Sequence, residues 1–196
     1  IKEGFKHKSI FLVGDIMYDV FLSVFNKLNK IDKTYDILVT FHRAENTESK
    51  TSMENIITNL NKLSAKYDIL FPMHPRTRII LKKNKLLKLF NKKITIVRPI
   101  SYVKSLYYLK YAKMLITDSG GMQKEAFYSK TQTLTLRSET EWPETIDLKW
   151  NRLVKIMGNE IFLKTIKFLN YKGKIKDIYG KGNTSKLILK KIKTLN

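Results

Sequence analysis

The chain has 196 residues, 43% of them hydrophobic, and carries 38 Lys plus Arg against 17 Asp plus Glu, a formal net charge of +21. Because it has no cysteine, disulfide scaffolds, cysteine zinc sites and thiol nucleophiles are excluded, and three histidines supply all its imidazoles. Its longest apolar runs are far shorter than the ~20 residues of a membrane helix, so we expect a soluble, cytoplasmic protein without a membrane partner.

Short apolar runs alternate with helical spacing along nearly the whole chain, which is typical of βαβ units. We therefore predict an α/β fold with a Rossmann-like, doubly wound parallel sheet in one domain over 1–196. The predicted strands are 10–13, 37–41, 69–73, 94–97, 114–117 and 133–136. Amphipathic helices are predicted between them, and a basic C-terminal helix over 172–196 closes the chain.

Polar residues follow the second predicted strand as His42, Arg43, Glu45 and Asn46. Ligands of open α/β sheets bind beyond the carboxyl ends of the strands, where this cluster falls. His42 can orient a phosphate or assist proton transfer, and Arg43 can fork onto an anion. The alternative is structural: His42 as a turn residue, with Arg43 paired to Glu45.

The third and fourth predicted strands end in further candidates. His74 lies on the same rim as His42, and the proline after it fixes an extended exit that lets Arg76 reach the ligand side. After the fourth strand, the backbone of 98–102 and the ring of Tyr102 can border a base.

The strongest local signal follows the fifth predicted strand, in residues 116–126. Ser119, Gly120 and Gly121 open a helix there, and two adjacent glycines let a ligand approach the N–H groups and the positive end of the helix dipole. We expect a phosphate at this point, and Glu125, one turn further on, as a ligand of sugar hydroxyls. The structural alternative is a helix cap at Asp118 or Ser119 with the glycines serving a tight turn.

The sixth predicted strand is followed by Arg137, which can neutralise a diphosphate. Glu139, Glu141 and Glu144 come next, and such a charge run is more often an acidic loop that begins a helix.

These motifs, in this order, closely resemble the non-hydrolysing UDP-N-acetylglucosamine 2-epimerase family. The resemblance extends from 13 to 182 and rests on four segments, 42–46, 74–78, 117–125 and 136–144. It implies two Rossmann-like halves in a glycosyltransferase-B-like arrangement, with this chain as the C-terminal half. Since the sequence begins at Ile1 without an initiator Met, we expect a missing N-terminal domain, toward which residues 172–196 pack.

The resemblance also implies roles for individual residues. His42 and Arg137 are the expected catalytic residues of this half. The expected substrate-binding residues are Arg43, Glu45, Asn46, His74, Arg76, Tyr102, Ser119, Gly120, Gly121 and Glu125. Among these, the resemblance places Ser119, Gly120 and Gly121 on the diphosphate and Glu125 on the ribose.

The implied reaction inverts C2 of a UDP-N-acetylhexosamine by eliminating UDP and adding it back, in the biosynthesis of cell-envelope polysaccharides. The resemblance assigns the catalytic carboxylates to the N-terminal half, so we expect the isolated chain to be inactive. No cofactor and no metal are expected, and a homodimer is the expected oligomer.

The sequence departs from the family pattern at two positions. Ser105 stands where an aromatic residue often stacks on the base, and Trp142 replaces an Arg. The second change, together with the segment 13–19, makes the sequence resemble more closely a branch acting on modified sugars such as UDP-2,3-diacetamido-glucuronate.

Two further classes stay open: a UDP-sugar glycosyltransferase half and a basic nucleic-acid-binding module. Only six of the 38 basic residues are Arg, the usual bidentate reader of phosphates and bases. We therefore interpret most of the charge as Lys on solvated helix faces and expect no specific nucleic-acid partner.

Overall fold

The computed structural model describes residues 4–29 and 33–194, so both ends of the expected domain 1–196 and the last two residues of the expected helix 172–196 lie outside the described part. The chain divides into two compact units. One, here called the sheet unit, comprises Leu28–Ile175. The other, here called the terminal unit, combines Ile1–Lys27 with Lys176–Asn196.

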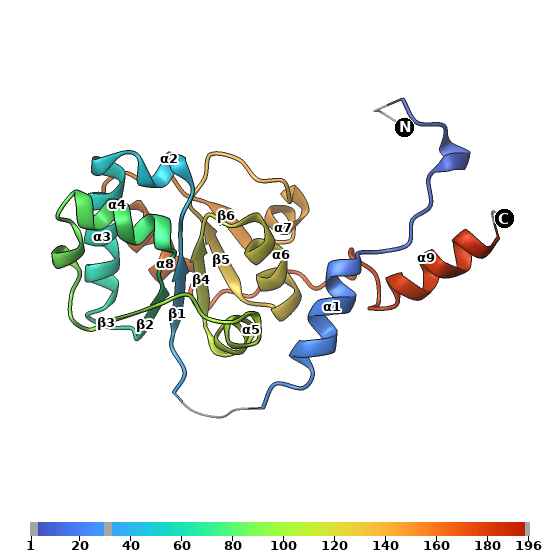
Figure 1. Ribbon diagram of the computed structural model, residues 1–196, viewed down its shortest axis with the longest axis horizontal. Coiled ribbons are helices and arrows are strands. Elements are labelled where there is room, and N and C mark those ends of the chain that lie inside the picture. Colours follow the sequence, from blue (N-terminus) through green and yellow to red (C-terminus); the bar gives the residue numbers. More distant parts are fainter. Residues whose placement is uncertain (1–3, 30–32, 195–196) are drawn as a thin grey trace. The chain divides into compact units, whose positions relative to one another are not determined.

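The sheet unit contains six parallel strands in the order β3-β2-β1-β4-β5-β6 (Figure 1). Their bounds are β1 Ile37–Thr40, β2 Ile69–Pro72, β3 Ile94–Val97, β4 Met114–Thr117, β5 Gln132–Thr135 and β6 Asn151–Leu153. The doubly wound α/β class is thereby confirmed. The strand order reverses direction between β1 and β4, which is the point where open sheets of this class bind ligands.

Helices cover both faces of the sheet. They are α2 Ala44–Thr47, α3 Lys50–Leu63, α4 Pro75–Lys83, α5 Tyr102–Tyr111, α6 Gly120–Ser129, α7 Pro143–Asp147 and α8 Glu160–Phe168, with a 3₁₀ turn η2 at Leu87–Leu89. Figure 1 shows α3 and α8 on one side of the sheet and α5 and α6 on the other. The amphipathic face of α3 is buried as its spacing predicts: Met53, Ile56 and Leu60 are fully enclosed.

The central strands form because their side chains are buried on both faces, which favours β-branched and large apolar residues. Ile37, Val39 and Ile116 have no exposed surface. In the register, Ile37 lies opposite Met114 and Thr40 lies opposite Thr117, so β1 and β4 end level with one another. The residues that follow each of these strands are therefore brought together.

One predicted strand is wrong, and one observed strand was not predicted. Residues 10–13 form no strand and lie in the terminal unit, where the side chain of Leu12 is 99% exposed. The strand that was not predicted is β6. Its residues are Asn, Arg and Leu, so it lacks the apolar run by which the other strands were predicted. β6 forms through backbone pairing with β5, in register from Thr133 with Asn151.

The terminal unit pairs α1, Ile16–Phe25, with α9, Thr184–Lys193, and also holds a short turn η1, His7–Ser9. Asp19 joins the two helices, since its carboxylate accepts hydrogen bonds from the backbone N–H groups of Thr184 and Ser185 at 3.0 and 2.8 Å. The expected helix 172–196 is too long, because 172–183 is irregular and helical structure begins at Thr184.

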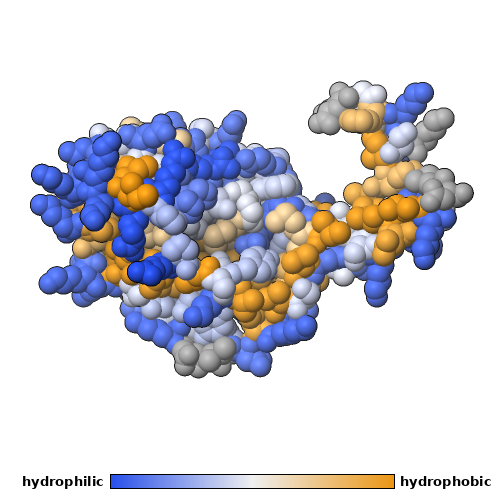
Figure 2. Space-filling model, viewed as in Figure 1, coloured by the Kyte–Doolittle hydropathy of each residue, from blue (hydrophilic) through white to orange (hydrophobic). Residues whose placement is uncertain are grey.

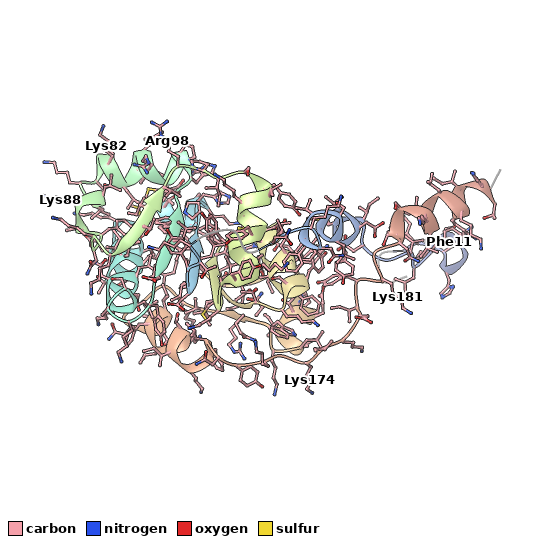
Figure 3. The ribbon with its side chains drawn as sticks, turned by 90° about the horizontal axis from the view of Figure 1, so that it is seen from below. Phe11, Lys82, Lys88, Arg98, Lys174 and Lys181 are labelled. Carbon is pink, nitrogen blue, oxygen red and sulfur yellow. The ribbon has the colours of Figure 1, made fainter. Side chains whose placement is uncertain are left out.

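The surface of the terminal unit is rich in exposed apolar side chains, seen as orange in Figure 2. Several lysines of the sheet unit are solvated charges: Lys82, Lys88 and Lys174 are exposed and point away from the ribbon in Figure 3. Among the described residues, no helix is long and apolar enough to cross a membrane.

Candidate functional site

The candidate site lies at the carboxyl ends of β1 and β4, where the strand order reverses. His42 and Arg43 follow β1 after Phe41, and Asp118 and Ser119 directly follow β4. The sequence prediction that the strand-end motifs share one edge of the sheet is confirmed for these two loops, since hydrogen bonds join them directly.

Asp118 is the centre of that junction. Its carboxylate is fully buried and accepts hydrogen bonds from the backbone N–H groups of His42 and Arg43, both at 2.9 Å. The side-chain amide of Asn46 donates to it at 2.8 Å, and also donates to the carbonyl oxygen of Leu136 at 3.0 Å. Asn46 is thus buried behind the rim, where it connects the loops after β1, β4 and β5.

Sequence reasoning considered Asp118 only as a helix cap. The cap of α6 is Ser119, whose hydroxyl accepts from the backbone N–H of Met122 at 3.4 Å. One signal pointed to Asp118: an ionisable residue directly after a buried strand that is apolar except for its last residue, Thr117, must find donors nearby, because an unpaired buried charge is costly.

His42 and His74 stack, with ring centroids 4.9 Å apart and planes 29° apart. The Nδ1 atom of His74 accepts a hydrogen bond from the backbone N–H of Arg76 at 3.1 Å, which leaves Nε2 to carry the proton. Burial and the neighbouring His42 and Arg76 lower the pKa of His74. A neutral imidazole with a donor nitrogen therefore stands next to His42 on the rim.

The first turn of α6 has open space beside its second residue, Gly121. Gly120 and Gly121 are its first two residues, and a Cβ built on Gly121 would meet nothing within 4 Å. The first N–H groups of a helix have no partner within the helix, and the helix dipole places partial positive charge there. Ser119 therefore serves as the cap that the structural alternative proposed, while the glycines leave room for an anion.

Glu125 and Tyr102 lie together behind this turn. Glu125 is 9% exposed, and its burial raises the pKa of its carboxyl to about 7, although a hydrogen bond from Tyr102 lowers it in part. Burial and the Glu125 carboxylate in turn raise the pKa of Tyr102 to about 12. A carboxylate held this way is ready to accept hydrogen bonds from hydroxyl groups of a ligand.

Arg137 supplies the positive charge of the site. Its side chain is 9% exposed and its Nη1 atom donates to both carboxylate oxygens of Glu141, at 2.8 and 2.7 Å. The Nε atom of Arg137 lies 3.5 Å from Glu45, and the Nη2 atom of Arg43 lies 3.7 Å from Glu141. The hydrogen bond to Glu141 raises the pKa of Arg137, so this guanidinium is always charged.

This arrangement differs from the structural alternative, in which Arg43 pairs with Glu45. Arg43 approaches Glu141, while Glu45 approaches Arg137. Arg76 is exposed and pairs with Glu48 at 3.1 Å, so it lies at the outer margin of the rim.

Trp142 also borders the site. Its indole N–H donates to the carbonyl oxygen of Gly120 at 3.0 Å, and the ammonium of Lys124 lies 4.2 Å from its ring centre. Sequence reasoning singled out this residue only as a departure from a family pattern.

A hollow of about 160 Å³ adjoins the rim, lined in part by His74, Pro99, Ile100, Ser105 and Met122. It includes the loop before α5 that was expected to border a base. Ligand sites usually measure ~300–1,000 Å³, so this hollow encloses only part of a nucleotide-sized ligand.

The site combines fixed guanidinium groups, an open helix start and a buried carboxylate, a set suited to a phosphate-bearing sugar ligand. No group of three or more His, Cys, Asp or Glu in the described part of the chain could hold a metal ion.

Comparison with known proteins gives one consistent result. The family model described as UDP-N-acetylglucosamine 2-epimerase matches residues 1–193. A UDP-N-acetylglucosamine 2-epimerase homolog of Methanococcus maripaludis is 37% identical over 96% of this chain and 56% of its own length. The UDP-2,3-diacetamido-2,3-dideoxy-D-glucuronate 2-epimerase of Pseudomonas aeruginosa is 34% identical over 78% of this chain and 44% of its own.

Among solved structures, the Methanocaldococcus jannaschii UDP-GlcNAc 2-epimerase in complex with UDP-GlcNAc and UDP superposes with a TM-score of 0.86 at 32% identity. The match covers 98% of this chain and 57% of that one. The chain thus spans about half the length of the curated relatives it matches.

Proposed function

The chain belongs to the UDP-N-acetylglucosamine 2-epimerase family, and we propose that it is the UDP-binding half of a non-hydrolysing 2-epimerase with a glycosyltransferase-B-like pair of domains. The observation that carries the proposal is the convergence of Arg137, Arg43 and the open start of α6 at the reversal of strand order. These are the groups that a diphosphate requires.

Each group has a place in this proposal. The diphosphate lies at Ser119, Gly120 and Gly121, with its charge balanced by the guanidinium groups of Arg137 and Arg43. Glu125 accepts hydrogen bonds from the ribose hydroxyls. The hollow beside His74 receives an edge of the uracil, with Tyr102 at its border.

The reaction inverts C2 of a UDP-N-acetylhexosamine by removing the C2 proton and eliminating UDP, then adding UDP back with the proton on the other face. Arg137 favours elimination by stabilising the charge of the leaving diphosphate. His42 faces the reacting end, where its imidazole can exchange a proton, and the buried Asp118 fixes the backbone of its loop.

The catalytic carboxylates are proposed to come from an N-terminal domain of the same enzyme, toward which 172–196 packs. The chain of 196 residues should then bind UDP weakly and turn over nothing by itself. A homodimer, a cytoplasmic location and the absence of a specific nucleic-acid partner stay predictions.

Calorimetric titration of the chain with UDP tests the binding role. We expect weak binding that falls by about tenfold or more in Arg137→Gln, since a charge-assisted hydrogen bond is lost. Lys82→Gln removes the same charge from an exposed position and should change little. Equal affinity in all three proteins would contradict the proposal.

The sugar has a second candidate. The similarity to the Pseudomonas aeruginosa enzyme, together with Trp142, favours UDP-2,3-diacetamido-glucuronate as an alternative substrate. Deuterium exchange at C2, measured for the enzyme assembled with an N-terminal domain, distinguishes the two substrates. The substrate that takes up deuterium, UDP-N-acetylglucosamine or the uronate, is the one supported. Exchange into neither contradicts the epimerase proposal.

A further inference from the structure

Glu141 occupies the centre of the positive charge in the site. Its two carboxylate oxygens accept from Arg137 at 2.8 and 2.7 Å, and one of them lies 3.7 Å from the Nη2 atom of Arg43. Arg137 pairing holds the pKa of the Glu141 carboxyl below its usual range, so this group is ionised at neutral pH.

The same carboxylate reaches the start of α6. Its Oε2 atom lies 3.4 Å from the place where a Cβ on Gly120 would be. Gly120 is the first residue of α6, whose leading N–H groups attract negative charge. One carboxylate therefore pairs with Arg137, approaches Arg43 and lies beside the start of α6.

A carboxylate and a phosphate offer the same chemistry to these partners, namely anionic oxygens that accept from guanidinium and backbone N–H groups. Both cannot take the same donors of Arg137 at once. The side chain of Glu141 is 48% exposed and that of Arg137 is 9% exposed, so Glu141 is the partner that can swing into solvent while Arg137 keeps its position.

We propose that Glu141 is an internal counter-anion that orients Arg43 and Arg137 before a ligand binds and that the ligand's diphosphate displaces. A ligand must then compete with the Glu141 carboxylate for the guanidinium groups of Arg43 and Arg137. A ligand with more than one anionic group does so better than a ligand with one, so Glu141 sets both the affinity and the anion selectivity of the site. The inference rests on the proposed binding of UDP at this site.

The test compares Glu141→Gln with the parent chain in titrations with UDP, inorganic pyrophosphate and inorganic phosphate. The glutamine keeps the shape of the side chain and removes its charge. Glu160→Gln is the matched control, since it removes one charge from the pair that Glu160 forms with Lys164 within α8. Thermal unfolding of each variant checks its fold.

We expect Glu141→Gln to bind UDP and pyrophosphate about fivefold more tightly, the range of one partly exposed ion pair near a helix start. The affinity for phosphate should increase by a larger factor than the affinity for pyrophosphate. The ratio of the two affinities is therefore smaller in Glu141→Gln than in the parent chain. Loss of a merely structural contact would weaken binding instead of strengthening it. Glu160→Gln should bind as the parent chain does.

The outcomes separate this inference from the proposed function. If the parent binds UDP and Glu141→Gln binds it equally or less tightly, the counter-anion role is wrong while UDP binding stands. If Glu141→Gln binds UDP and the parent chain does not, the counter-anion role is supported, because the carboxylate then blocks the site completely. If neither protein binds UDP or pyrophosphate, both proposals are contradicted.

Discussion

The carboxylate of Asp118 accepts hydrogen bonds from the backbone N–H of His42 at 2.9 and 3.1 Å. This contact spans 76 positions of the sequence and fixes the loop after β1 to the residue that follows β4. The imidazole of His42 also lies 3.5 Å from the same carboxylate, measured from its Nδ1 atom, so Asp118 fixes the spacing between His42 and the start of α6.

Replacing Asp118 by Asn should lower the free energy of unfolding by about 2–3 kcal/mol, because an amide replaces the buried acceptor of several N–H groups. Urea unfolding monitored by circular dichroism measures this. Asp147→Asn, at an exposed position in α7, is the control and should stay within about 0.5 kcal/mol of the parent. If the two variants are equally stable, the hydrogen bonds that Asp118 accepts do not stabilise the fold as argued.

UDP affinity should rise with pH through neutrality. Burial raises the pKa of Glu125 to about 7, and only its ionised form accepts hydrogen bonds from ribose hydroxyls at both oxygens. Below pH 7 the bound state must expel a proton, at a cost of up to about tenfold in affinity per pH unit. Titrations from pH 5.5 to 8.5, roughly one and a half units on each side of that pKa, measure the profile.

UDP itself titrates near pH 6, so the comparison with Glu125→Gln isolates the protein's contribution. The variant should keep only the ligand's own dependence. A profile that is the same in both proteins would show that Glu125 does not contact the nucleotide.

Tyr102→Phe should move that profile to higher pH. The hydroxyl of Tyr102 donates a hydrogen bond to the Glu125 carboxylate and lowers its pKa, whereas Phe keeps the aromatic ring without the hydroxyl. Removing the hydroxyl therefore raises the pKa of Glu125 further. Tyr111→Phe, on the same helix, is the control and should leave the midpoint in place; a shift to lower pH in Tyr102→Phe would reverse the assigned sign.

The stability of the chain should fall as pH rises from about 4.5 to about 7, to the extent that Glu125 contributes. The pKa of Glu125 is higher in the folded state than in the unfolded state, so between the two values the folded state binds a proton more tightly. The stability that this proton provides is lost as the pH rises and the proton dissociates. The two pKa values imply a difference of at most about 3 kcal/mol between these pH values. Urea unfolding of Glu125→Gln should show a smaller decline over that interval than the parent.

Gly121→Ala should separate binding from folding. A Cβ there meets nothing within 4 Å, and alanine favours the helix by up to about 1 kcal/mol. The fold should therefore be at least as stable, while UDP affinity falls by about tenfold because the methyl group occupies the approach of the phosphate. Undiminished UDP binding in a stable Gly121→Ala chain would place the diphosphate elsewhere.

The sequence predicts the central strands well because burial on both faces leaves a run of apolar residues, as in 37–40 and 114–117. The sequence prediction of strands fails in two places, residues 10–13 and β6. The run 10–13 is apolar but exposed, and β6 pairs through its backbone while its first side chain, Asn151, is polar and buried.

The rim could be predicted because parallel strands end at one edge of a sheet, which brings their following residues together. The partners of Asp118 and Glu141 could not, since both depend on how one loop folds against another. The donors to Asp118 lie more than 70 positions earlier, and nothing in the local sequence distinguishes Glu141 from Glu139 or Glu144.

Trp142 gives the molecule an optical reporter. Its indole N–H is bonded to the carbonyl of Gly120 and a lysine ammonium lies over its ring, so any anion that arrives at the start of α6 alters the electric field on the fluorophore. The chain's other tryptophan, Trp150, is 3% exposed and donates to the carbonyl of Lys174 instead. Occupancy of the site can therefore be followed by intrinsic emission, with Trp142→Phe as the blank and no added label.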